Sequence, residues 1–300
     1  MIPEILKQML VRQYGEELTE QIVAGMKGPR AVTLRANTLK STAADVETIL
    51  KDAGIAFEKA PFSEDAFILP EAIEKDIWQL DMYKEGKVYL QSLSSMLPVL
   101  ALDPQESTDI LDMAAAPGGK TAQIAAMTHN KAGIMACEIN KIRAEKLKYN
   151  VEKQGATRVN VMVRDARQLE DFFRFDQILL DAPCSGSGTV LESDPGSCKA
   201  FSEKLVKNSA RTQLEMLKKA IRILKTGQTM VYSTCSILAE ENERNVKAIL
   251  SEKQCVVDPI SLEGMDQLPL LPCGIEGALC IAPTALYEGF FMCRLKKTGR

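Results

Sequence analysis

From about residue 91 onward, short apolar segments alternate with longer amphipathic ones, and this alternation constrains the fold more than any other feature. The short apolar segments predict buried strands, whereas the longer segments between them have the apolar spacing of helices. Such alternation is typical of an α/β fold with a doubly wound parallel sheet. The predicted strands are 108–113, 132–138, 158–163, 175–181 and 228–233, with C-terminal strands that include 289–295, and the predicted helices are 118–128, 140–154, 203–225 and 239–252.

The first 90 residues have a different pattern and predict a separate module. Residues 1–26 show the apolar spacing of one or two amphipathic helices. The elements expected next are a strand over 31–38, a helix over 43–54 capped by Ser41 or Thr42, and short strands over 55–60 and 66–70. This β-α-β-β order suggests a small α+β module of ferredoxin or RNA-recognition type, which either contacts RNA or caps the main domain structurally. We therefore expect two domains, 1–90 and 91–300.

The composition excludes several classes of protein. Apolar residues make up 46% and charged residues 26%, as in ordinary globular proteins. No apolar run reaches the roughly 18 residues of a membrane span, and the charged N-terminus argues against a secretory signal. The single histidine, His129, leaves almost nothing for a Ser-His-Asp triad or a histidine-rich zinc site. The eight scattered cysteines fit a cytoplasmic protein that holds no metal.

The first motif with chemical content is the turn Asp112–Thr121, which follows the first predicted strand of the alternating region. It looks superficially like a phosphate-binding GxxxxGK[ST] loop. However, Ala114 stands where the leading glycine belongs, and Pro117 removes a backbone donor that an anion would need. The turn instead suits the approach of an adenosyl cofactor, with Gly118 and Gly119 allowing close contact.

Acidic residues follow the next two predicted strands, where such a cofactor needs them. Glu138 lies 19 residues after Gly119 and is expected to bind the ribose hydroxyls. Asp165 ends the third strand, where a side chain can reach the adenine amino group. Taken alone, Glu138 could be an acid at a strand end and Asp165 could be a helix cap.

Two cysteines are predicted to lie at the ends of neighbouring strands. The segment Asp181–Gly188 carries Cys184, and the segment Val231–Ser236 carries Cys235. Because the carboxyl ends of parallel strands line the ligand site of such sheets, both thiols should point at one rim. A single buried cysteine is usually a core residue, but two thiols among small polar residues favour chemistry. The other six cysteines are interpreted as packing residues.

Four motifs together resemble the Sun/Nop (Fmu/RsmB-type) family of RNA cytosine-5 methyltransferases. They are DMAAAPGGKT, DAPCSGSGT, YSTCS with the following EENERNV, and the terminal GFF. The resemblance covers residues 90–300 well and 30–100 loosely, where RANTLK is similar to a short family motif. It implies a Rossmann-like class I methyltransferase sheet that binds S-adenosylmethionine. The cofactor-binding residues it implies are Ala114, Ala115, Ala116, Pro117, Gly118, Gly119, Lys120, Glu138, Arg143, Asp165 and Asp181.

The resemblance also implies catalytic roles. Cys235 would attack carbon 6 of cytosine as a thiolate, and Cys184 would serve in the release of the product. Asp181 would bind the base edge around ring nitrogen 3 and the amine. Lys120 is expected either to help ionise Cys235 or to act as an ionic partner within the cofactor turn. Arg143 is expected beside the ribose acid, although it could be a solvated helix charge.

The expected partner is RNA, either ribosomal RNA or tRNA, and the target base must be unpaired or flipped out. With a net charge of −3, binding would need a local basic groove. The candidate phosphate contacts are Arg30, Arg35 and Lys40, and Arg294, Lys296, Lys297 and Arg300 in the tail. The alternatives are a non-catalytic RNA-binding or ribosome-assembly factor, a small-molecule methyltransferase and a cysteine hydrolase. A monomer without membrane contact is expected.

Overall fold

The computed structural model describes residues 1–299, except for the side chain of Ala200. The chain divides into two compact units that interleave along the sequence. The first unit consists of Met1–Arg30, Leu180–Ile260 and Leu268–Arg300, and the second consists of Ala31–Leu179 and Ser261–Gln267. The domain boundary expected at residue 90 stays a proposal.

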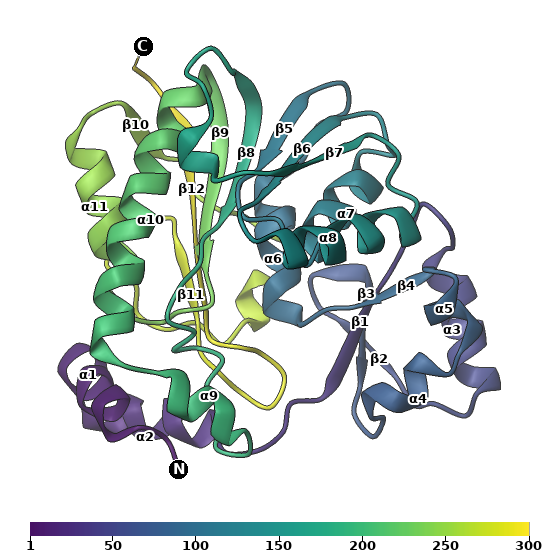
Figure 1. Ribbon diagram of the computed structural model, residues 1–300. Helices are drawn as coiled ribbons and strands as arrows, with labels where there is room; N and C mark the ends of the chain where they lie inside the picture. The colour runs from purple at the N-terminus through teal and green to yellow at the C-terminus, as the bar shows by residue number, and fades with distance from the viewer. Residues whose placement is uncertain (300) are drawn as a thin grey trace. The chain divides into compact units, whose positions relative to one another are not determined.

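The second unit begins with a four-stranded antiparallel sheet in the order β2-β3-β1-β4 (Figure 1). Its elements are β1 (Val32–Ala36), α3 (Ala43–Asp52), β2 (Glu58–Ala60), β3 (Ser63–Leu69), α4 (Glu74–Trp78), α5 (Asp81–Lys84) and β4 (Val88–Leu90). The β-α-β-β order from β1 to β3 is the one that the sequence predicted, and α4, α5 and β4 complete the β-α-β-β-α-β succession of a ferredoxin-like module. Thr42 is the residue that caps α3, because its hydroxyl accepts from the backbone N–H of Asp45.

The core of this module contains side chains from the sheet and from α3. Leu34 and Phe67 project from the sheet and pack with Val46 and Leu50 of the helix, and all four are fully buried. Each such side chain contributes about 1.5–3 kcal/mol through removal of apolar surface from water. The helical spacing of Val46 and Leu50 therefore fixes α3 against the sheet.

The rest of the second unit is the parallel sheet expected from the strand–helix alternation. Strands β8, β5, β6 and β7 lie side by side in that order and run parallel (Figure 1). Helices α7 and α8 pack on β6. The elements are α6 (Leu93–Leu102), β5 (Asp109–Asp112), α7 (Gly119–Met127), β6 (Gly133–Glu138), α8 (Lys141–Lys153), β7 (Val159–Val163), η1 (Ala166–Gln168), β8 (Phe175–Asp181) and η2 (Met265–Gln267).

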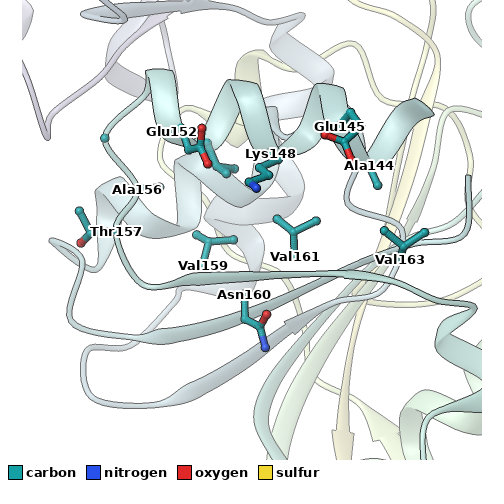
Figure 2. A pocket seen from close by; sticks show the side chains of 12 residues that line it. Ala144, Glu145, Lys148, Glu152, Ala156, Thr157, Val159, Asn160, Val161 and Val163 are labelled. Atoms are coloured by element: carbon teal, nitrogen blue, oxygen red, sulfur yellow. The ribbon is translucent and has the colours of Figure 1, made fainter. Parts of the chain in front are cut away.

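A hollow lies between α8 and the outermost parallel strand, β7. Lys148 and Glu152 of the helix face Val159 and Val161 of the strand across it (Figure 2). None of the residues expected to bind the cofactor or to take part in catalysis lines this hollow.

The first unit contains a mixed arrangement of helices and antiparallel strands. Strand β12 pairs antiparallel with β9, β10 and β11. Helix α10 packs against both β9 and α11 (Figure 1). The elements are α1 (Glu4–Tyr14), α2 (Glu16–Gly25), α9 (Pro195–Ala200), α10 (Glu203–Ile223), β9 (Leu224–Thr234), α11 (Glu243–Ser251), β10 (Cys255–Val257), β11 (Leu279–Ile281) and β12 (Phe290–Lys297). Across residues 1–299, every helix is too short or too polar to span a bilayer.

Candidate active site

The turn after β5 is held by contacts within the second unit. The Thr121 hydroxyl donates to the buried Asp112 carboxylate at 2.7 Å, and the Ala115 N–H donates to the Cys137 carbonyl at 2.9 Å. Gly118 has a φ of +111°, which disfavours residues with a side chain. A Cβ on Gly119 would lie 2.7 Å from the ring of Tyr89. Both glycines predicted in the turn therefore have a structural reason for being there.

The structure brings the expected ribose acid, the expected arginine and the turn together. Glu138 ends β6, and its side chain is only 2% exposed. Its carboxylate accepts from the Asn140 N–H at 2.8 Å and lies 3.3 Å from the guanidinium of Arg143. Arg143 also donates to the Ala116 carbonyl at 2.9 Å. The arginine thus ties the end of β6 to the turn after β5.

Asp165 follows β7 and caps the short helix η1. Its carboxylate accepts from the backbone N–H of Arg167 at 2.9 Å and from the guanidinium of the same residue at 2.7 Å. The hydrogen bond from that side chain holds the pKa of Asp165 below its ordinary value. Sequence analysis missed Arg167, although an arginine two residues after an expected cofactor acid was visible. Asp165 is therefore both a cap and a strand-end acid.

Lys120 has a partner inside the second unit. Its ammonium donates to the hydroxyl of Ser95, on α6, at 2.6 Å. Its expected role in ionising Cys235 stays a prediction.

The three expected catalytic residues of the first unit lie together. Asp181 ends β8 and Cys235 directly follows β9, and the Ala182 N–H donates to the Ser233 carbonyl at 2.8 Å. The Ser233 hydroxyl donates to the Asp181 carboxylate, also at 2.8 Å. The sulfur atoms of Cys184 and Cys235 are in hydrogen-bond contact at 2.9 Å. Two thiols that are 51 residues apart in the chain therefore form one pair.

The pairing changes the acidity of one of the two thiols. The hydrogen bond with Cys235 raises the pKa of Cys184 well above its ordinary value, and burial adds to the effect. Cys184 therefore remains protonated at neutral pH. Of the six cysteines interpreted as packing residues, Cys137, Cys255, Cys280 and Cys293 are buried, whereas Cys198 and Cys273 are only partly buried.

A buried polar group behind the thiols was given no role by sequence analysis. Glu241 and Gln213 are fully buried and hydrogen-bonded to each other at 3.1 Å. Glu241 lies in the EENERNV motif, so its position was visible in the sequence. Its burial was not visible, because its hydrogen-bond partners Ser185 and Gln213 are distant in the sequence and come close only in the folded chain.

Several basic residues proposed as phosphate contacts have other roles. Arg35 is 5% exposed and donates to the side chain of Gln91, and Lys297 is 5% exposed and donates to two backbone carbonyls. The prediction was wrong for both, because buried side chains cannot reach a phosphate. Lys40 is exposed but donates to the carbonyls of Glu85 and Lys153. Arg300 lies outside the described residues.

Comparison with known proteins identifies the family. Residues 99–296 match the model of the 16S rRNA methyltransferase RsmB/F family, and residues 2–75 match the ferredoxin-like domain of RsmF/B-like methyltransferases. The chain belongs to the RsmB/F family. This finding confirms the resemblance drawn from the motifs, and the second match confirms the ferredoxin-like module.

The RsmB/F chain is similar to several known proteins. It is 33% identical over 99% of its length to the probable ribosomal RNA small subunit methyltransferase B of Bacillus subtilis, of which it covers 66%. Its structural alignment with a methyltransferase homolog from Pyrococcus horikoshii covers 99% of this chain and all of that protein, with 29% identity and a TM-score of 0.82. NSun6 from the same organism, solved with SFG, shares the fold with a TM-score of 0.88 at 24% identity, over all of this chain and 99% of NSun6. The chain spans 59–66% of the length of the curated relatives it matches.

Proposed function

We propose that this protein transfers a methyl group from S-adenosylmethionine to carbon 5 of a cytosine in ribosomal RNA through a covalent Cys–cytosine adduct. The observation that carries the proposal is the contact between the sulfur atoms of Cys184 and Cys235, 2.9 Å apart at the ends of two strands. The neighbouring carboxylate of Asp181 supplies a group that can bind a base edge. Membership of a methyltransferase family supports the reaction type.

Carbon 5 of cytosine is a poor nucleophile, so the reaction needs a thiol. A bond forms between the Cys235 sulfur and carbon 6, which makes carbon 5 electron-rich enough to take a methyl group. The proton on carbon 5 then leaves, the carbon–sulfur bond breaks, and the 5,6 double bond and the Cys235 thiolate are restored. Cys235 thus starts and ends the cycle in the same state.

Cys184 suits the release step. In the free protein the hydrogen bond with Cys235 is the largest cause of its raised pKa. When Cys235 is bonded to carbon 6, that hydrogen bond is lost and Cys184 becomes easier to deprotonate. A base is needed at this stage, because the proton on carbon 5 must be removed.

Asp181 is suited to holding the base. The Ser233 hydroxyl donates to one of its oxygens at 2.8 Å, which fixes the orientation of the carboxylate. The proposed role is to bind ring nitrogen 3 and the exocyclic amine, and to stabilise the protonated adduct.

The residues of the second unit fit an adenosyl cofactor. Glu138 would bind the ribose hydroxyls, Asp165 would bind the adenine amino group, and the turn Asp112–Thr121 would hold the methionine part. Ile139 directly follows Glu138 and is 65% exposed, so an apolar surface lies next to the acid, as a purine ring requires. When bound, S-adenosylmethionine supplies the electrophilic methyl group.

The choice of ribosomal RNA over tRNA is supported by relatives named as ribosomal RNA small subunit methyltransferases. Lys296 is exposed and remains a candidate phosphate contact. The proposal includes the cytoplasmic location expected from the sequence, because the substrate is found there. A monomeric state stays a prediction.

The proposal is tested by methyl transfer from labelled S-adenosylmethionine to unmodified total RNA, followed by separation by size and digestion to nucleosides. We expect label in 5-methylcytidine from small-subunit ribosomal RNA. Label in tRNA would correct the substrate, and label in another nucleoside would contradict thiol addition. If neither naked RNA nor assembling small-subunit particles take up label, a non-catalytic RNA-binding or ribosome-assembly role replaces the proposal.

A further inference from the structure

A single buried carboxylate connects the two segments that carry the thiols. Glu241 is fully buried. One of its oxygens accepts from the Ser185 N–H at 2.7 Å and from the Gln213 amide at 3.1 Å. The other oxygen accepts from the hydroxyls of Ser185 and Ser236, at 2.5 and 2.6 Å. Four donors therefore converge on one side chain.

Two of the residues that donate to Glu241 are sequence neighbours of the two thiols. Ser185 directly follows Cys184, and Ser236 directly follows Cys235. Glu241 thus hydrogen-bonds the residue after each thiol. Since neighbouring residues share a peptide plane, these bonds restrict where both sulfur atoms can lie.

The backbone of Glu241 and the side chain of the following Asn242 are themselves held in place. The Tyr232 hydroxyl, on β9, donates to the backbone carbonyl of Glu241 at 2.5 Å. The Asn242 side chain accepts from the Thr234 hydroxyl at 2.6 Å and donates to the Ser236 carbonyl at 2.7 Å. The carboxylate is therefore fixed relative to the end of β9, which is what a group that positions Cys235 needs.

Burying a carboxylate costs more free energy than burying a neutral side chain in the same structural link would. Its burial costs free energy unless its oxygens are saturated with donors, and four donors match the accepting capacity of the ionised group. None of these four contacts is to a cation. The carboxylate lies close enough to the thiols to contribute to the raised pKa of Cys184, after the hydrogen bond with Cys235 and burial.

We propose that Glu241 is a positioning residue that holds Cys184 and Cys235 in contact by bridging the residues that follow them. The inference rests on the proposed function only in taking these thiols as the reacting groups. Replacement by Gln would put an NH2 group on one side of the bridge. If that group faced the two nitrogen donors, both would lose their acceptor. If it faced the two hydroxyls, it would donate to them, and the two hydroxyl protons that Glu241 now accepts would need other acceptors.

The spacing of the thiols can be measured without RNA or methyl donor. Phenylarsine oxide condenses with two adjacent thiols: two arsenic–sulfur bonds form, and the arsenic-bound oxygen leaves as water with the two thiol protons. The background variant carries Cys198→Ser and Cys273→Ser, because these are the other partly exposed cysteines among the described residues. Binding of phenylarsine oxide is followed by mass spectrometry and titration.

We expect Glu241→Gln to weaken phenylarsine oxide binding at least tenfold and Glu240→Gln to leave it unchanged. Glu240 is the matched control, because it precedes Glu241 but forms an ion pair with Arg244 and is 31% exposed. If Glu241→Gln fails to give a cooperative thermal transition, Ser185→Ala removes one donor to the same carboxylate and should weaken binding at least threefold. Unchanged affinity in the folded variant would overturn the proposal.

Methyl-transfer kinetics separate positioning from general stability. Glu241→Gln should lower kcat at least tenfold and leave KM for S-adenosylmethionine within twofold of the parent, because only the thiol pair is disturbed. A parallel rise in that KM would indicate general disruption and contradict a positioning role. If the parent protein binds phenylarsine oxide but transfers no methyl group, the proposed function fails. The effect of Glu241→Gln on phenylarsine oxide binding still tests whether Glu241 holds the two thiols in contact.

Discussion

The guanidinium of Arg143 lies 3.3 Å from the carboxylate of Glu138 and covers an acid whose own side chain is almost inaccessible. The same guanidinium donates to the carbonyl of Ala116 in the preceding turn. Two strand ends of the parallel sheet are therefore joined by one side chain. If the cofactor binds at this edge, Arg143 both orients the ribose acid and shapes the turn.

We expect Glu138→Ala to weaken S-adenosylmethionine binding by at least tenfold and Arg143→Ala by a smaller factor. The loss follows from hydrogen bonds to a charged group, which contribute about 1.5–3 kcal/mol, where 1.4 kcal/mol is tenfold in affinity. Isothermal titration calorimetry checks the prediction. Glu145→Ala is the control, because Glu145 is an exposed acid on α8, the helix that carries Arg143. Equal affinity of Glu138→Ala and the parent protein would place the ribose elsewhere.

The two thiols should behave differently when each is removed. Cys184→Ala should accumulate a covalent protein–RNA adduct, because addition and methylation proceed but release is blocked. Cys235→Ala should form no adduct and transfer no methyl group. Labelled RNA that remains with the protein on a denaturing gel measures the adduct, and Cys198→Ala should match the parent protein. An adduct in Cys235→Ala would reverse the assigned roles.

Strand ends were the most predictable part of the site. Glu138 and Asp181 each end a strand that apolar periodicity identified, and Cys235 directly follows another. The ferredoxin-like module was predictable for a similar reason, since its strands and helix have distinct periods and Thr42 marks a helix start. These features depend on residues that are close in the sequence.

The rest depended on contacts between distant segments. Nothing local distinguishes the buried Glu241 from the half-buried Glu240 beside it, or the buried Arg35 from an exposed arginine. Their burial follows from which segments pack over them, and only the folded chain defines that. Basic residues were therefore overinterpreted as RNA contacts, and the carboxylate behind the thiols was overlooked.

The N-terminal cap of helix α3 should contribute measurably to stability. The hydroxyl of Thr42 and the carboxylate of Asp45 each accept from the other's backbone N–H, which forms a capping box. Thr42→Ala should lower the free energy of unfolding by about 1 kcal/mol. Thr48→Ala is the matched control, because Thr48 lies within the same helix and its exposed hydroxyl donates to the Ala44 carbonyl in the preceding turn. Urea denaturation of both variants decides, and a loss as large in Thr48→Ala would exclude the cap as the cause.

Stability at alkaline pH should depend on Cys137, which lies fully buried in β6 just before Glu138. Burial, with a smaller contribution from the charge of Asp112, raises the pKa of Cys137 to about 12. In the unfolded chain the thiol ionises near its ordinary value of about 8.5. Because the folded pKa is the higher one, the stabilising contribution is complete below about pH 8.5 and is lost as the pH rises toward 12.

The parent protein should therefore lose about 2.5 kcal/mol more of its unfolding free energy between pH 8 and 10.5 than Cys137→Ala does. All other titratable groups are present in both proteins. The difference between their slopes of unfolding free energy against pH therefore reports the ionisation of Cys137 alone. The variant starts from a lower stability at pH 8, because a small cavity replaces the sulfur atom. Urea titrations at half-unit pH steps measure both slopes, and identical slopes would mean that the thiol ionises as readily in the folded protein as in the unfolded chain.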